Sequence, residues 1–278
     1  MITIKVNETP RKIPSNLGLM DLKAEVRPDA DVLIYNGFPV TENIQLREGD
    51  SVVLFKKAAS PSERELEVLM MARHTPGVHE RVKRGRVGIA GLGGLGSQIA
   101  FALARVGVGT LVLVDYDVVE PSNLNRQQYF IDQIGMVKVD ALRENLSRIN
   151  PYINVVTHNT LLNAENIAPI FAEVDIVVEA FDRAEMKAML INTVSQLHPD
   201  KYIVAASGLA GYEDSNTIKT THFSSRIFIV GDQKTAAQPG MGLMAPRVGI
   251  AAHHQANLVL RILLGKEGQE AGSQEASV

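Results

Sequence analysis

The sequence predicts an α/β fold in which a mainly parallel sheet carries helices on both faces, preceded by a smaller domain rich in β-strands. From about residue 86 onward, short apolar runs alternate with helical patterns, which is typical of parallel strands joined by helices. Before about residue 57, short strands surround one brief helix. A chain of 278 residues with 45% hydrophobic residues is long enough for about two domains with buried cores.

Composition excludes several classes of function. A net charge of −3 without a basic run argues against nucleic acid as a main partner. The first residues form a strand pattern, not a signal peptide, and no apolar run is long enough to span a membrane, so we expect a cytoplasmic protein without a membrane partner. The sequence contains no cysteine, which excludes a disulfide, a cysteine zinc site and a thioester on this chain.

The first domain is expected over residues 1–57. Two strands end near Ile13, a helix follows over Leu19 to Val26, and further strands cover Val32 to Tyr35 and Ser51 to Lys56. This order resembles a ubiquitin-like β-grasp of the ThiS sulfur-carrier type. A linker is expected at residues 58–63.

A strand, a glycine turn, a helix and a second strand follow one another over residues 86–115. Gly91, Gly93 and Gly94 let the backbone bend tightly and approach a phosphate, whose charge then meets free N–H groups at the helix start. Asp115 ends the second strand and is placed to accept hydrogen bonds from ribose hydroxyls. This spacing alone fits a dinucleotide site equally well.

The polar segment that follows favours ATP. A helix N-terminus is worth at most ~2 kcal/mol to an anion, so a triphosphate needs fixed cations as well. Arg126 in this segment and Lys138 after it supply such cations. We expect the polar side chains of the segment to contact the nucleotide: Asp117, Ser122, Asn123, Asn125 and Arg126.

At these residues the chain resembles the ThiF/MoeB/HesA family, the ubiquitin-activating-enzyme-like adenylyltransferases. The family shows GxGGLGS, an aspartate ending the next strand, SNLxRQ and a later lysine, which are here Gly91 to Ser97, Asp115, Ser122 to Gln127 and Lys138. The likeness covers about residues 64–265 and implies a Rossmann-like fold. It also implies a homodimer that adenylates the C-terminal glycine of a small ubiquitin-like sulfur carrier, with the closest fit to ThiF-type proteins of the thiamine pathway.

The chain departs from many relatives because it lacks their paired CxxC zinc motifs and their loop cysteine. Only adenylation therefore carries over, with ATP and Mg²⁺ but no zinc, and a separate protein must donate sulfur. The β-grasp domain cannot itself be activated, since it runs on through Lys56 and Lys57 without ending in a Gly-Gly carboxylate. Two interpretations of this domain stay open. It has a docking, dimerising or regulatory role, or it is a remnant that only stabilises the protein.

Two basic residues have both a structural and a functional interpretation. Ser62 and Glu65 have capping-box spacing and predict a helix to about Arg73. The resemblance implies that Arg73 reaches the partner subunit's ATP site; otherwise it is a charged helix end. Lys138 opens a helix, where a cation opposes the dipole, and a phosphate ligand would account for it.

Asp182 follows an apolar strand that covers Asp175 to Ala180. With Glu185 it has capping-box spacing, and the resemblance places the magnesium-associated aspartate at the same position, so we expect both roles. Glu179 is a weaker candidate for the metal.

The rest of the chain completes the sheet. We expect a strand at 153–157, a helix at 164–172 interrupted by Pro169, a strand at 202–206, a hairpin at 217–230 and an apolar helix at 248–264. The resemblance assigns binding of the carrier's tail to the loop at 237–246, which is otherwise a plain connector. Residues 266–278 are expected to be disordered.

Two rival functions remain open from the sequence. An NAD-dependent dehydrogenase shares the glycine turn but not the SNLNRQ segment or its cations. A non-catalytic regulator could have the tethered β-grasp domain in its carrier site. Within adenylation, the carrier could belong to thiamine, molybdopterin or another thiolation route.

Overall fold

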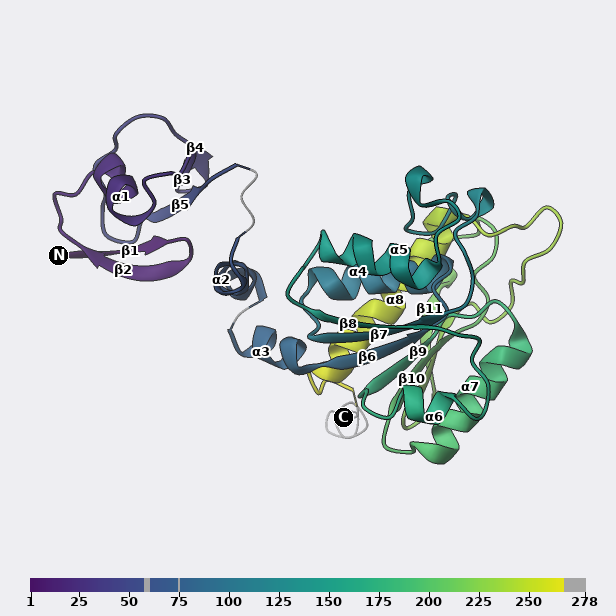
Figure 1. Cartoon of the computed structure of the whole chain (residues 1–278). Helices are drawn as coiled ribbons and strands as arrows, with labels where there is room; N and C mark the ends of the chain where they lie inside the picture. Colours follow the sequence, from purple (N-terminus) through teal and green to yellow (C-terminus); the bar gives the residue numbers. More distant parts are fainter. Residues whose placement is uncertain (58–60, 75, 268–278) are drawn as a thin grey trace. The chain divides into compact units, whose positions relative to one another are not determined.

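A computed structural model describes residues 1–57, 61–74 and 76–267, which form two compact units, Met1–His79 and Glu80–Val278 (Figure 1). Residues 58–60 of the expected linker and 268–278 of the expected tail lie outside the described residues.

The first unit contains a five-stranded sheet in the order β2-β1-β5-β3-β4. The strands are β1 (Ile2–Val6), β2 (Thr9–Ile13), β3 (Val32–Tyr35), β4 (Phe38–Pro39) and β5 (Ser51–Phe55), and the helix that shares their core is α1 (Leu19–Val26). β1 runs parallel to β5 and the other pairs are antiparallel. Apolar residues of the sheet and of α1 form one core, which contains Ile4, Ile13, Leu19, Leu22, Val52 and Leu54. This arrangement confirms the predicted β-grasp.

Helix α2 (Glu63–His74) begins with the predicted capping box. The Ser62 amide donates to Glu65 Oε2 at 2.8 Å, and the Glu65 amide donates to Ser62 Oγ at 3.3 Å. Arg73 lies near the end of this helix, but its side chain is outside the described part of the chain. Its predicted reach into a partner subunit therefore stays a prediction.

The second unit contains a seven-stranded sheet in the order β11-β12-β10-β9-β6-β7-β8. The strands are β6 (Arg86–Ala90), β7 (Thr110–Asp115), β8 (Asn154–Asn159), β9 (Ile176–Glu179), β10 (Tyr202–Ala206), β11 (Lys219–Ser224) and β12 (Ile227–Gly231). All pairs are parallel except β11 with β12, which confirms the mainly parallel sheet. The hairpin begins later than expected because residues 215–217 form a 3₁₀ turn.

Helices cover both faces of this sheet (Figure 1). One face carries α4 (Gly94–Arg105), α5 (Lys138–Ser147) and α8 (Ala245–Leu263), the other α6 (Ile167–Ile170) and α7 (Ala184–Leu197), while α3 (Pro76–Arg84) leads into β6. In the described ranges, no helix combines the length and apolar content needed to cross a membrane.

The helix expected at 164–172 is reduced to the single turn α6, so its predicted length is wrong. Asn163 Oδ1 accepts from the amides of Glu165 and Asn166, which holds the preceding residues in a turn. Pro169 has no N–H to donate to a longer helix.

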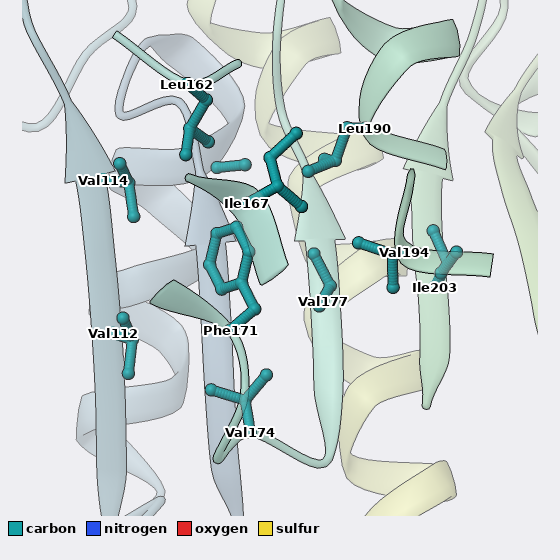
Figure 2. Packing of buried hydrophobic residues seen from close by; sticks show 11 residues of the cluster. Val112, Val114, Leu162, Ile167, Phe171, Val174, Val177, Leu190, Val194 and Ile203 are labelled. Carbon is teal, nitrogen blue, oxygen red and sulfur yellow. The ribbon is translucent and has the colours of Figure 1, made fainter. Parts of the chain in front are cut away.

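Phe171, directly after α6, fills the space between α6, α7 and the sheet (Figure 2). It is fully buried, and its cluster includes side chains of three parallel strands, of both helices and of Val174 just before β9: Val112, Val114, Ile167, Val174, Val177, Leu190, Val194 and Ile203. Strands covered on both faces are continuously apolar, which explains the unbroken hydrophobic runs in the sequence.

The strand order locates the site. From β6 the chain builds β7 and β8 toward one edge, then returns to add β9, β10 and β12 on the other side. The order therefore reverses between β6 and β9, and open α/β sheets bind ligands at the carboxyl ends of strands beside such a reversal.

We predict that Phe171→Ala lowers the free energy of unfolding by about 3–5 kcal/mol, because it removes a fully buried ring and leaves a cavity. Phe223→Ala is the matched control, since this ring on β11 is 70% exposed and its loss should cost less than about 0.5 kcal/mol. Urea denaturation of both variants, followed by tyrosine fluorescence, which reports mainly on the unit Glu80–Val278, measures the difference. Equal midpoints would contradict the packing of Phe171.

Candidate functional site

The glycine turn between β6 and α4 depends on two residues without a side chain. Gly91 has a φ of +90°, a conformation that side chains disfavour. At Gly96, a Cβ atom would lie 1.9 Å from the carbonyl oxygen of Gly91. Helix α4 can therefore start directly against the end of β6 only because both positions are glycine.

The start of α4 presents free amides. Its first helical hydrogen bond runs from the Ser97 amide to the Gly93 carbonyl at 3.1 Å, so the amides before Ser97 have no partner within the helix. A Cβ at Gly93 would have only Gln127 Nε2 within 4 Å, at 3.8 Å. The backbone is thus open to an anion where the sequence predicts a phosphate.

A cavity of about 560 Å³ lies over this turn and extends across the carboxyl ends of the parallel strands. The predicted residues that line it are Gly91, Gly93, Gly94, Asp115, Asp117, Asn123, Arg126, Lys138 and Asp182. Ser122 and Asn125 are not part of the lining. The structure therefore brings together most of the predicted site from four separate stretches of sequence.

Asp115 joins the glycine turn to the polar segment after β7. One carboxylate oxygen accepts from the Leu92 amide at 2.6 Å and the other from the Asp117 amide at 2.9 Å. Both oxygens retain acceptor capacity, since each can take a second hydrogen bond. The residue can thus hold the turn and still accept from a ligand hydroxyl.

Lys138 is paired with Asp117. The two charged groups are 2.9 Å apart, and the lysine side chain is only 7% exposed. Asp117 thereby compensates a cation that the start of α5 disfavours. A phosphate is not needed to explain the position of Lys138, although the residue does line the cavity.

The guanidinium of Arg126 is held by its own loop. It donates to the Ser122 carbonyl at 3.2 Å and to Asn125 Oδ1 at 2.8 Å. Asn125 also donates to the Leu243 carbonyl at 3.2 Å, and buried Asn123 accepts from the Glu120 amide at 3.1 Å. Ser122 and Asn125 thus support Arg126 from outside the cavity.

Tyr129 is a residue that sequence reasoning missed. Its buried hydroxyl donates to the Leu92 carbonyl at 2.9 Å and so fixes the polar segment to the glycine turn. Burial, together with the charges of Asp115 and Asp117, raises the pKa of Tyr129, which keeps the donor proton in place. The one available signal was an aromatic residue with a polar tip beside the SNLNRQ motif.

Asp182 lines the cavity but does not cap α7, so the predicted capping box is wrong. The helix starts at Ala184 with Arg183 at its N-cap, and the side chain of this N-cap residue accepts no hydrogen bond from the helix start. Glu185 instead pairs with Arg183 at 2.5 Å. In the described part of the chain, the exposed carboxylate of Asp182 has no hydrogen-bond or ion-pair partner.

Glu179 is fully buried at the end of β9 and is not exposed to the cavity. Its carboxylate pairs with Lys187 at 2.9 Å and also accepts from the amides of Phe181 and Ala206. Burial raises the pKa of Glu179, while the charge of Lys187 and these hydrogen bonds oppose the rise. The pair joins the ends of β9 and β10 to α7, and of its two residues Lys187 also lines the cavity.

The cavity fits a phosphate-bound metal better than a metal held by protein alone. Across the described ranges, no three histidine, aspartate or glutamate side chains are grouped closely enough to hold an ion. Mg²⁺ commonly binds through one or two carboxylates, waters and substrate phosphates. A single unpaired carboxylate, Asp182, in the same cavity as an open helix start is compatible with that pattern.

Residues 67–276 match the ThiF family, and residues 2–58 match the ThiS-like ubiquitin family. The chain belongs to the ThiF family. This agrees with the glycine turn, Asp115, the SNLNRQ segment and Lys138, which the fold collects around one cavity.

Similar proteins include the molybdopterin-synthase adenylyltransferase of Haemophilus influenzae, 34% identical over 194 residues that cover 67% of this chain and 79% of that protein. The adenylyltransferase and sulfurtransferase UBA4 of Candida glabrata is 30% identical over 262 residues. The match covers 87% of this chain, which thus spans only 57% of the length of that relative.

A solved structure with a similar fold is the tRNA N6-threonylcarbamoyladenosine dehydratase TcdA of E. coli, in complex with ATP. The TM-score is 0.67 at 22% identity, with 74% of this chain and 97% of that chain covered. This likeness concerns the fold alone.

We predict that Glu179→Gln lowers the free energy of unfolding by roughly 3 kcal/mol, because it leaves the Lys187 ammonium without its counter-charge. This value is at the low end of the cost of breaking a buried ion pair, because the Lys187 side chain is 21% exposed. The double variant Glu179→Gln with Lys187→Met should recover part of the loss. Thermal or urea unfolding measures both, and a single variant as stable as wild type would contradict a stabilising role for the pair.

Proposed function

We propose that the chain catalyses ATP-dependent adenylylation of the C-terminal glycine of a small ubiquitin-like sulfur carrier. The observation that carries the proposal is the single cavity of this ThiF-family chain. The open start of α4, Asp115 at the end of β7 and the cations Arg126 and Lys138 all line it. The names of two relatives support it, since one is a molybdopterin-synthase adenylyltransferase and the other is the adenylyltransferase and sulfurtransferase UBA4. ATP in the structural neighbour supports the choice of nucleotide.

In the proposed reaction, a carboxylate oxygen of the carrier bonds to the α-phosphorus of ATP. The bond to the β-phosphate breaks and pyrophosphate leaves with the electron pair, so the product is an acyl-adenylate. A terminal carboxyl has a pKa of about 3.5 and is ionised at neutral pH, so no general base is required. Catalysis then rests on positioning and on neutralising phosphate charge.

Each part of the cavity has a role in this scheme. The amides of Gly93 and Gly94 would bind phosphate oxygens, and Asp115 would accept from the ribose. Arg126 and Lys138 would neutralise phosphate charge, with Asn123 as a further polar contact. Asp117 would keep Lys138 oriented until the nucleotide arrives.

Asp182 would hold Mg²⁺, and the ion would supply further neutralisation of the phosphates when bound. In a homodimer, Arg73 of one copy would add a cation to the site of the other. Since the chain has no cysteine, a separate protein would donate sulfur to the acyl-adenylate. We place the reaction in the cytoplasm.

For the carrier we propose the ThiS-type protein of thiazole synthesis. The support is the ThiS-like domain at residues 2–58 together with the ThiF family match. A molybdopterin-type carrier is the alternative favoured by the names of several relatives. The two are separated by offering each carrier in turn.

A regulatory function is the second candidate. It is favoured by the fused ThiS-like domain, whose last strand continues into Lys56 and Lys57 without a Gly-Gly end. A tethered domain in the carrier site would block free carriers. Activity that appears only after deletion of residues 1–60 would identify this case.

We predict that wild-type protein catalyses ATP–pyrophosphate exchange with one Gly-Gly-ending carrier and that Arg126→Ala lowers the rate at least 100-fold, because phosphate charge is left unneutralised. The exposed Arg105→Ala at the end of α4 should keep the wild-type rate. Circular dichroism checks that both variants fold. Wild-type exchange by Arg126→Ala would remove this residue from the mechanism, and tight binding of NAD in place of ATP would favour a dehydrogenase.

We predict that Asp182→Asn raises the Mg²⁺ concentration needed for half-maximal exchange by about tenfold, because a neutral amide is a weaker ligand than a carboxylate. A Mg²⁺ titration of the exchange rate at fixed ATP measures this. Glu144→Gln, which changes an exposed carboxylate on α5 outside the cavity, serves as the control. An unchanged Mg²⁺ dependence would assign Asp182 a role other than metal binding.

A further inference from the structure

Within the described part of the chain, the buried side chain of Gln127 makes no hydrogen bond. The residue ends the SNLNRQ segment and is only 7% exposed. Its Oε1 atom is enclosed by protein groups that do not donate to it, whereas the residue as a whole lines the cavity. A buried amide left without partners destabilises a protein, so this side chain requires an explanation.

The other buried glutamines of the described residues all donate to the protein. Gln133 and Gln255 each donate two hydrogen bonds through Nε2. Gln98 donates one, to the Arg126 carbonyl at 3.2 Å. Gln127 differs from these three because its Nε2 is left for a group from outside the chain.

The main chain on both sides of this glutamine is held in place. The Gln127 amide donates to the Asn123 carbonyl at 2.9 Å. Ser97 Oγ, in the first turn of α4, accepts from the Gln128 amide at 3.1 Å and donates to the Gly93 carbonyl at 2.7 Å. The backbone that carries the Gln127 side chain is therefore fixed relative to the open amides of α4.

The side chain is directed at the glycine turn. A Cβ atom at Gly93 would lie 3.8 Å from Gln127 Nε2, and both residues line the cavity. A helix start with open amides binds anions, and here a buried neutral donor lies beside those amides. An anion oxygen bound at the turn would thus have Nε2 within its reach.

The position of the turn selects one phosphate of the proposed nucleotide. Asp115, which would accept from the ribose, also accepts from the Leu92 amide at 2.6 Å, and Gly93 is the next residue in the chain. In ATP the ribose carries the α-phosphate directly. The phosphate closest to Gly93 and Gln127 is therefore the α-phosphate, whose phosphorus the carrier attacks in the proposed reaction.

We propose that Gln127 is a catalytic residue whose Nε2 donates a hydrogen bond to a non-bridging oxygen of the α-phosphate. This inference rests on the proposed function. The carboxylate–phosphorus bond forms and the bond to the β-phosphate breaks, while both amide protons stay on Nε2. A donor already held in place stabilises charge on that oxygen in the transition state without reorganisation. Arg126 and Lys138 would neutralise the phosphates, whereas Gln127 would contact the reacting group.

The first test compares Gln127→Met with Gln128→Met. Methionine keeps the length of glutamine without its donor, and Gln128 is a neighbouring glutamine outside the cavity whose main-chain contact survives a change of side chain. In ATP–pyrophosphate exchange with a carrier, Gln127→Met should lower kcat about 100-fold, because the donor to the reacting oxygen is lost. The KM for the carrier should stay within about twofold. Gln128→Met should keep both wild-type constants.

Unfolding of the ligand-free protein separates a catalytic from a structural role. If Gln127 only supported the fold, Gln127→Met would lower the free energy of unfolding. We expect the variant to be at least as stable as wild type, since the substitution removes a buried amide that has no partner. Urea denaturation followed by tyrosine fluorescence measures this.

Sulfur substitution in ATP identifies the oxygen that accepts from Gln127. ATP with sulfur in place of one non-bridging α-oxygen exists as two diastereomers, and sulfur accepts hydrogen bonds poorly. Wild type should use the two at different rates. Gln127→Met should reduce the ratio of these rates at least about fivefold, and Gln128→Met should keep the wild-type ratio. ATP with sulfur on the γ-phosphate should slow wild type and Gln127→Met by the same factor.

Four outcomes would overturn the inference. Wild-type kcat in Gln127→Met would remove this residue from the mechanism and leave the proposed function intact. A slow variant that is less stable and keeps the wild-type diastereomer ratio would make Gln127 a structural residue. A change confined to the KM for the carrier would make it a carrier contact. If wild type exchanges pyrophosphate with no carrier, the proposed function and this inference are lost together.

Discussion

The close approach of Gly96 to the carbonyl of Gly91 is the constraint on which the site depends. Because no side chain separates them, α4 starts immediately above the end of β6 and its free amides open into the cavity. Asp115 and Tyr129 then bond to the backbone of the residue between, Leu92, from two sides. A side-chain methyl group at Gly96 would displace the start of α4 and both of these anchors together.

Charge in the cavity is arranged before any ligand is present. Three of the lining cations have a carboxylate partner, and Arg126 is held by its own loop. Donors held in place need little reorganisation when charge develops on a substrate, which is the main source of electrostatic catalysis. Compensation also limits the repulsion among cations that share one cavity.

Local patterns allowed the half of the cavity beside the glycine turn to be predicted from sequence. The glycine turn, Asp115 and the start of α5 each depend on residues close together in the chain, and the fold confirms that their strands lie side by side. The order of strands and helix in the β-grasp could be predicted for the same reason, since it too depends on residues close together in the chain. The spacing of Asp182 and Glu185 was not enough to predict the helix cap correctly. Arg183 occupies the N-cap position, and Glu185 pairs with Arg183.

The half of the cavity beside β10 and β12 could not be predicted from the sequence, because contacts between distant segments build it. The bond from Arg247 to Asp232 spans 15 residues, and those to the Glu213 and Asp214 carbonyls span more than 30. In the sequence, Arg247 looks like an isolated charge at the start of an apolar helix. Only the arrangement of β10, β12 and α8 shows that it is buried and what it holds.

The two units have separate hydrophobic cores, and this has a consequence for how the protein is studied optically. A chain with two cores can lose them in two steps, so one transition midpoint does not describe it. The sequence has no tryptophan, and five of its six tyrosines lie in Glu80–Val278. Intrinsic fluorescence therefore follows the larger unit almost exclusively, and melting of the β-grasp would go nearly unnoticed unless a probe such as Phe55→Trp were introduced there.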